Sequence, residues 1–225
     1  MLSKRLSAVA LLLVALFLTG CGGSVTTDLY VQDIVEIVEG LEGLKEPIFT
    51  SSTIGVESPG EEYNAQLIEL LERSFRDVKN VRTTDQDYST YVLVDVKIPI
   101  LMLEDYETLW VDDEALGIII VDMEDGSAGF GLGMNSDKLD KLFSAFSEEV
   151  WDSASIEDFA FSVKLYNDTR DPVFAALQGV YANGVPIAYE EVFEMARRDI
   201  LELRLGDVAR DAAYQDGIVI LGVVE

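Results

Sequence analysis

Two short acidic clusters contain the residues of this chain whose types and spacing most resemble a reactive or metal-binding site. The first is Asp112, Asp113 and Glu114, and the second is Asp122, Glu124 and Asp125, just before Gly126. Ca²⁺ and Mg²⁺ prefer oxygen ligands, so both clusters could hold a divalent cation. Neither has the spacing of an EF-hand loop, because Gly126 comes one position early and the terminal Glu is missing. In so acidic a chain we favour solvated acidic loops over a metal site.

The composition excludes several classes of function. The chain has 225 residues with 16 Lys and Arg against 42 Asp and Glu, a formal net charge of −26, no His and one Cys. Phosphate backbones repel such a charge, so we expect no nucleic-acid partner. Without His there is no Ser-His-Asp site, no Cys-His site and no His-ligated zinc. A pair of carboxylates could still hydrolyse a glycoside, but sequence spacing does not reveal which pair would meet in space.

The N-terminal residues predict secretion. Lys4 and Arg5 precede an uninterrupted apolar run over residues 6–18. This run is shorter than the about 20 residues with which a helix crosses a bilayer. A short basic segment followed by a short apolar run is typical of a secretory signal peptide, which we assign to residues 1–20.

The apolar run ends in Leu18-Thr19-Gly20-Cys21, which resembles the lipobox of bacterial lipoproteins. The resemblance implies a diacylglycerol on the Cys21 thiol, cleavage between Gly20 and Cys21, and acylation of the new amino group by a chain such as palmitate. Several acyl chains on one residue anchor a protein stably, so the membrane itself is an expected partner. Gly22 follows Cys21 in place of the Asp that favours inner-membrane retention. We therefore expect a location in the bacterial cell envelope, on the outer membrane and facing the periplasm.

The rest of the chain predicts a single domain. Residues 21–24 form a short lipidated tether in this interpretation, and residues 25–225 form one folded body without a linker or a low-complexity tract. The sole cysteine is consumed by the lipid, so no thiol is left for a disulfide or a nucleophile.

Two amphipathic helices are expected. Ser58-Pro59-Gly60-Glu61 has the residue types of a helix start, and the apolar positions that follow extend to Val78. Asn135 or Ser136 caps the second helix, whose apolar face is Leu139, Leu142, Phe143, Phe146 and Val150. A short third helix is expected after a cap at Asp207.

Most other segments predict strands. β-branched or alternating segments cover residues 54–56, 91–100, 116–123, 128–134, 159–166, 173–181, 201–205 and 218–224, while 188–198 is ambiguous between helix and strand. Asp125-Gly126 and Asn183-Gly184 are two-residue hairpin signals. The sequence therefore predicts an α+β fold, with a largely antiparallel twisted sheet and the two amphipathic helices on one face.

Gly129-Phe130-Gly131-Leu132-Gly133 precedes the second helix, as a phosphate-binding loop would. Its spacing fits neither a dinucleotide fingerprint nor a P-loop, and no Lys follows at the required place. We interpret it as a strand thinned by glycines where another element packs closely.

Two segments carry a resemblance to a known family. They are Val25-Thr26-Thr27-Asp28-Leu29-Tyr30 and Gln178-Gly179-Val180-Tyr181-Ala182-Asn183-Gly184. The mature part is similar to a family of small lipoproteins of bacteria and their phages that has no assigned activity. The resemblance implies no catalytic residues, and it suggests a phage or prophage origin.

Two hypotheses follow from different classes. The favoured one is a non-catalytic interaction module that is tethered to an envelope membrane and contacts an envelope protein, which predicts an exposed apolar patch rimmed by acids. The alternative is a divalent-cation-dependent or carboxylate-based enzyme acting on an envelope glycan, which predicts a cleft with clustered carboxylates and perturbed pKa values.

Overall fold

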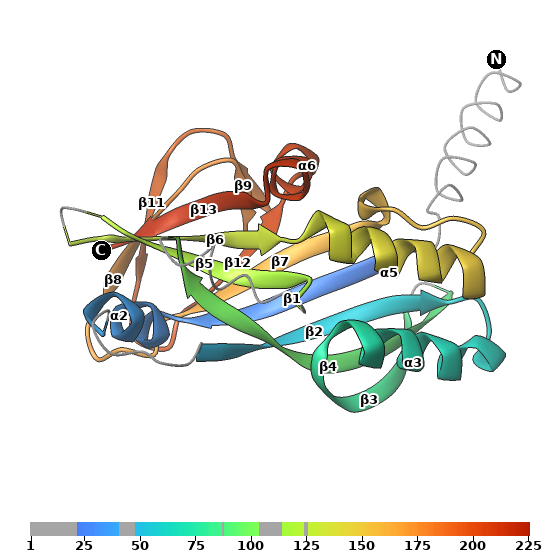
Figure 1. Ribbon diagram of the computed structural model, residues 1–225. Coiled ribbons are helices and arrows are strands. Elements are labelled where there is room, and N and C mark those ends of the chain that lie inside the picture. Colours follow the sequence, from blue (N-terminus) through green and yellow to red (C-terminus); the bar gives the residue numbers. More distant parts are fainter. Residues whose placement is uncertain (1–21, 41–47, 87, 104–113, 124–125) are drawn as a thin grey trace, which may run out of the picture.

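The computed structural model describes residues 22–40, 48–86, 88–103, 114–123 and 126–225 (Figure 1). Its strands are β1 (Gly23–Tyr30), β2 (Ile48–Ser58), β3 (Arg76–Gln86), β4 (Ser89–Met102), β5 (Leu116–Asp122), β6 (Ala128–Met134), β7 (Phe159–Tyr166), β8 (Val173–Leu177), β9 (Val180–Ala182), β10 (Val185–Ile187), β11 (Glu191–Met195), β12 (Ile200–Leu205) and β13 (Ile218–Val224). Its helices are α2 (Val31–Glu39), α3 (Asn64–Ser74), α5 (Ser136–Glu149) and α6 (Asp207–Asp216), with 3₁₀ helices η1 (Glu61–Tyr63) and η3 (Ile156–Asp158).

The strands form one 13-stranded sheet in the order β10-β9-β12-β7-β1-β2-β4-β5-β6-β13-β8-β11, with β3 paired beside β4. Neighbours are antiparallel except for two parallel pairs, β1 with β7 and β4 with β5. The predicted α+β class and the largely antiparallel pairing are therefore confirmed. The prediction of a simple twisted sheet was wrong, because the sheet curves round into a near-barrel (Figure 1).

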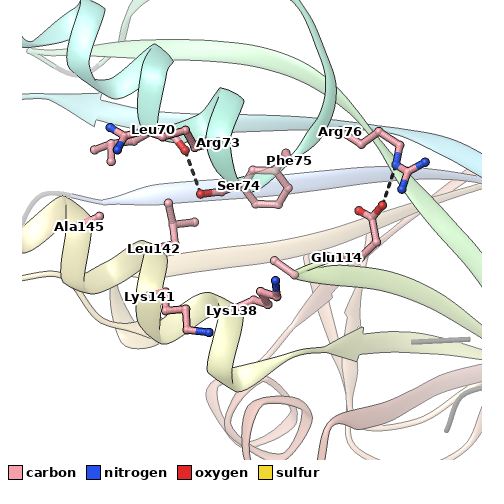
Figure 2. A pocket seen from close by; sticks show the side chains of 11 residues that line it. Leu70, Arg73, Ser74, Phe75, Arg76, Glu114, Lys138, Lys141, Leu142 and Ala145 are labelled. Carbon is pink, nitrogen blue, oxygen red and sulfur yellow. Dashed lines mark hydrogen bonds and ion pairs between the residues drawn. The ribbon is translucent and has the colours of Figure 1, made fainter. Parts of the chain in front are cut away.

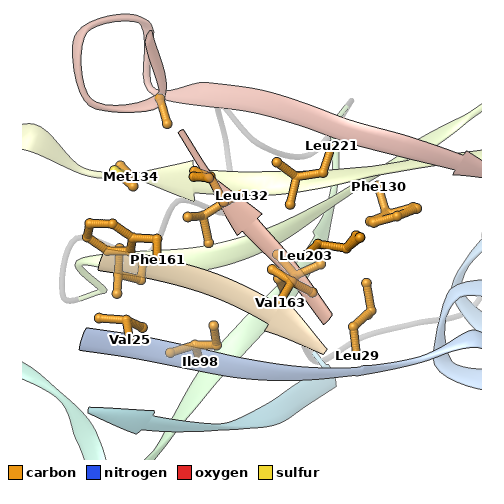
Figure 3. Close-up of a cluster of buried hydrophobic side chains, with 14 of the residues drawn as sticks. Val25, Leu29, Ile98, Phe130, Leu132, Met134, Phe161, Val163, Leu203 and Leu221 are labelled. Atoms are coloured by element: carbon orange, nitrogen blue, oxygen red, sulfur yellow. The ribbon is translucent and has the colours of Figure 1, made fainter. Parts of the chain in front are cut away.

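The core explains this curvature. Figure 3 shows Leu29 of β1, Phe130 of β6, Val163 of β7, Leu203 of β12 and Leu221 of β13 gathered in one interior. All five are buried, although β7 and β13 are separated by five other strands in the sheet order. Curling the sheet brings their apolar side chains together and removes them from water, which stabilises the fold by roughly 25 cal/mol for each Å² buried.

The two predicted amphipathic helices lie next to each other beside the sheet (Figure 1). In α5 the side chain of Asn135 accepts a hydrogen bond from the Lys138 backbone N–H, which confirms the predicted cap. The predicted apolar face is also confirmed, since four of its residues are buried: Leu139, Leu142, Phe143 and Phe146.

The first amphipathic helix is shorter than expected at both ends. The Ser58 hydroxyl donates to the Gly60 carbonyl and contacts the Asn64 side chain, and a 3₁₀ turn precedes α3. The helix ends at Ser74 because Phe75 adopts an extended backbone and is buried. Val78, expected in the helix, lies in β3 instead.

Several strand boundaries also differ. The single strand expected over residues 173–181 is divided into β8 and β9, and Gly179 between them has a positive φ of 74°. The ambiguous segment 188–198 contains β11. The Asn183-Gly184 hairpin is confirmed between β9 and β10, with positive φ at both turn residues. Asp207 is the first residue of α6, and Gly206 occupies the cap position.

Candidate functional site

The predicted acidic clusters are only partly visible. Asp112, Asp113, Glu124 and Asp125 lie outside the described residues. Asp122 is exposed at the end of β5, and Glu114 is buried just before β5. Within the described part of the chain, no three His, Cys, Asp or Glu side chains are grouped so that they could hold a metal ion. The structure therefore supplies no support for the predicted cation site.

Gly20 and Cys21, the predicted cleavage and lipidation residues, also lie outside the described residues. The chain is hydrogen-bonded from Gly22 onward: the Gly22 N–H donates to Glu57 Oε2 over 3.1 Å, and the Gly22 carbonyl accepts from the Glu57 N–H over 2.9 Å. Gly23 and Ser24, expected in the tether, belong to β1. Of the helices that the structure describes, none has the length and apolar character needed to cross a membrane.

The glycine-rich segment 129–133 is a structural strand. It forms most of β6, in which every residue is buried. A Cβ atom built on Gly131 would lie 2.2 Å from the Val219 carbonyl oxygen of the neighbouring strand β13. Close approach of another strand therefore explains this glycine, which confirms the structural interpretation over a phosphate-binding loop.

An exposed apolar surface lies where the sheet ends at β11. We call it the apolar face, and it consists of Phe174, Ala176, Val192, Ile220 and Val223. In the sheet register Val192 of β11 pairs with Ala176 of β8, which pairs with Val223 of β13. The side chains of Val192, Phe174 and Ile220 are 59%, 42% and 41% exposed. Alternation along β8 and β11, together with the register shift between Ile220 and Gly222 in β13, places all five on the side of the sheet opposite the core.

Acidic side chains border this face. Phe174 pairs with Glu194 of β11 on one side and exchanges two backbone hydrogen bonds with Glu225 on the other. Glu191 at the start of β11 is also exposed, but it pairs with the buried Leu177 and so lies on the other side of the strand. Among the described residues β11 pairs with β8 alone, so one side of it is an open sheet edge. Charged residues are a usual device for preventing such an edge from pairing with itself.

A second surface gathers basic side chains. A pocket of about 370 Å³ lies between the end of α3 and the start of α5, and we call it the basic pocket (Figure 2). Figure 2 shows Arg73 and Arg76 on one wall and Lys138 and Lys141 on the other. These are four of the 16 lysines and arginines of the whole chain. Apolar side chains, including Leu70, Phe75 and Leu142, complete the lining.

Glu114, a predicted metal ligand, belongs to the basic pocket as an ion-pair partner. It is 2% exposed, and its Oε1 accepts a hydrogen bond from Arg76 Nε over 2.8 Å. The Arg76 guanidinium also lies over the Phe49 ring, 4.9 Å from its centroid. Two contacts thus hold Arg76 in place, and its terminal nitrogens make no further bond to any described residue.

Perturbed pKa values occur away from both surfaces. Burial and a hydrogen bond from its hydroxyl to Asp28 raise the pKa of Tyr166 to about 12. Burial and a hydrogen bond to Asp140 raise the pKa of Tyr214 to about 12. Burial and the neighbouring Asp168 raise the pKa of Asp33. Tyr166 and Asp33 belong to one group near the end of β1. The Tyr30 ring stacks on the Tyr166 ring at a centroid distance of 4.9 Å, and burial and the carboxylates of Asp28, Asp33 and Asp168 raise the pKa of Tyr30.

The fold and its surfaces define a class of protein, a mixed α+β domain that offers an open sheet edge and a basic pocket. The chain belongs to the family described as a domain of unknown function (DUF7424), which matches residues 23–225. The matched region starts where β1 starts. Neither the curated proteins nor the solved structures contain a match to this chain.

Sequence reasoning singled out neither surface. The apolar face combines residues from three segments between positions 174 and 223, and strand alternation alone could not show that β8, β11 and β13 are neighbours. The sequence does contain a pattern that could have indicated the basic pocket. Arg73 and Arg76 are three positions apart, and so are Lys138 and Lys141, in a chain with few bases. Lys138 and Lys141 both belong to α5, so this spacing puts their side chains on one face of the helix.

Proposed function

We propose that this protein is a lipid-anchored component of the bacterial cell envelope, on the outer membrane and facing the periplasm, that acts as a non-catalytic interaction module. The lipobox ending in Cys21 supports the anchor. The observation that carries the interaction role is the apolar face beside the open edge of β11, since exposed apolar surface rimmed by polar groups is typical of a contact site.

The apolar and acidic side chains of this face indicate what kind of protein surface it would bind. Glu194 and Glu225 border the apolar face, so a complementary protein surface carries an apolar centre with Lys or Arg at its rim. A second copy of this chain does not fit, because its own glutamates would meet them and like charges repel. The open backbone of β11 can also accept a strand from the partner, a common mode of recognition at sheet edges.

The opposite end of the sheet is less suited to this role. β10 is its last strand, and it has only three residues, of which Pro186 has no backbone N–H to donate. Short strands and prolines are devices that protect an edge from pairing. Val185 in β10 is nevertheless as exposed as Val192 in β11, at 59%. The two valines therefore form a matched pair for an experiment.

The anchor is tested first. In cells fed labelled palmitate, the native chain should become labelled and fractionate with the outer membrane. A Cys21→Ser variant should do neither. Labelling of the variant, or a native chain recovered entirely in the soluble periplasm, would disprove the anchor without bearing on the apolar face.

The interaction is tested by photocrosslinking in cells. A photoreactive phenylalanine at position 192 should give one dominant adduct with another envelope protein, while the same group at position 185 should give none. Phe174→Glu should reduce the position-192 adduct, because it replaces the largest apolar side chain of this face with a charge. Equal adducts from both positions, or an adduct that Phe174→Glu leaves unchanged, would contradict the proposed role of this face.

A further inference from the structure

We infer that the basic pocket between α3 and α5 binds an anionic group, a phosphate or a carboxylate, carried on a small and partly apolar molecule. The inference is independent of the membrane anchor and of the apolar face. It rests on the charges that converge on the pocket, on the donors that they leave available, and on the shape of the lining.

The charge distribution is the first argument. The chain has 42 acidic and 16 basic residues, yet four basic side chains and only one acidic side chain line this pocket. α3 and α5 are otherwise rich in acids on their outward faces, as Glu72, Asp137 and Glu148 show.

The second argument is which donors an anion could use. The Arg76 guanidinium donates its Nε–H to Glu114 and lies over the Phe49 ring. These two contacts leave its terminal N–H groups for a ligand. A planar guanidinium can donate two parallel hydrogen bonds to a phosphate or a carboxylate. Lys141 is exposed and has no ion-pair partner among the described residues. These two side chains come from different walls of the same pocket, with Arg76 beside Glu114 and Lys141 on α5 (Figure 2).

The groups that compete with a ligand are weak or already satisfied. Arg73 lies 3.7 Å from Glu69 and 3.6 Å from Glu149, and all three side chains are exposed, so these pairs contribute little. Glu114 is the one buried acid in the lining, and Arg76 already neutralises it. An anion that contacts Arg73 or Arg76 therefore removes no strong ion pair of these two arginines.

The lining limits the rest of the ligand. Leu70, Phe75 and Leu142 contribute apolar surface, and the volume of about 370 Å³ is near the lower end of the range for small-molecule pockets. A bare inorganic ion would leave this surface in contact with water. A small anion with a ring or a short apolar chain would cover it, and would gain affinity from that burial.

The test uses the full-length chain purified in neutral detergent, at constant ionic strength. Binding of inorganic phosphate and of phenyl phosphate is measured by isothermal titration calorimetry. The variant Lys141→Gln removes one charge from the pocket, and the matched control Lys164→Gln removes one from β7, on the outer side of the sheet. Arg76→Lys keeps the charge and removes the planar fork.

We expect saturable binding of both anions, with phenyl phosphate bound at least about threefold more tightly because it buries apolar surface. Lys141→Gln and Arg76→Lys should each weaken binding by about fivefold to tenfold, the loss of one charge-assisted hydrogen bond at a partly exposed site. Lys164→Gln should leave the affinity within about twofold. The inference is overturned if neither anion binds saturably, or if Lys141→Gln and Lys164→Gln have the same effect.

Discussion

Replacing Gly131 by alanine should strongly destabilise the protein, whereas the same change at Gly129, two positions earlier on β6, should not. The added Cβ at position 131 would lie 2.2 Å from the Val219 carbonyl oxygen, and 3.0 Å from the carbonyl carbon. Cβ atoms essentially never approach another heavy atom more closely than 3.0 Å, so β6 and β13 would have to separate by nearly an ångström. The obstacle is backbone, which cannot rotate away as a side chain can.

Overpacking of this kind costs typically 1–3 kcal/mol, and we expect about 3 kcal/mol because the strand pairing itself is disturbed. For a chain of this length that loss lowers the melting temperature by about 6–12 °C. At Gly129 the added Cβ would meet only side chains, Val121 at 3.3 Å and Met123 at 3.4 Å. Gly129→Ala should therefore change the free energy of unfolding by less than about 1 kcal/mol.

The assay is denaturant unfolding of the full-length variants, followed by the fluorescence of the buried Trp151. The two substitutions are chemically identical and lie on the same strand, so they differ only in what the new methyl group meets. A Gly131→Ala protein as stable as the native one would refute the reasoning. So would an equal loss at both positions, because it would point to a general effect of alanine in β6.

Three further predictions concern buried polar groups. Arg76→Ala should lower the free energy of unfolding by about 1–3 kcal/mol because it leaves Glu114 buried without its partner, and adding Glu114→Gln should recover part of the loss in denaturant unfolding. The Tyr166 hydroxyl should ionise near pH 12, measured as the difference in ultraviolet absorbance between the native chain and Tyr166→Phe during a pH titration. Because burial and Asp28 raise this pKa, the stability that the protonated hydroxyl contributes is complete below pH 10.0 and is lost as the pH rises to about 12. A titration midpoint near 10.0 would contradict the prediction. Asn167→Ala should cost about 2–4 kcal/mol in thermal unfolding, because the fully buried amide makes four hydrogen bonds that tie two loops together, and a neutral result would show that water can replace it.

Local signals in the sequence predicted local structure well. The start of α5 follows from Asn135, whose side chain caps the helix, and from an apolar period that needs no distant partner. The β9–β10 hairpin follows from Asn183-Gly184, because these residues tolerate the positive φ that the turn requires. The predicted start of the first amphipathic helix was wrong because the Ser58 hydroxyl, expected to cap the helix, bonds to Gly60 and Asn64 instead. The helix α3 therefore starts later.

The near-barrel could not be predicted, since it depends on pairs far apart in the chain. Thr26 of β1 pairs with Ser162 of β7 in parallel, and nothing in either strand alone specifies that partner. Glu114 shows the same limit at the candidate site. An acidic cluster predicted a cation ligand, whereas the fold supplies Arg76 from 38 positions earlier to neutralise this carboxylate.

The most direct test of the proposed interaction is the yield of the position-192 photocrosslink in cells, compared between the native chain and the double variant Glu194→Lys, Glu225→Lys. If an apolar surface with an acidic rim recognises a partner with a basic rim, the native chain gives a single strong adduct and reversal of the two charges lowers its yield at least about tenfold. The anchor and the core are untouched by these exposed substitutions, so abundance and location should not change. An adduct of equal yield in both chains would contradict the account, as would the absence of any adduct from position 192.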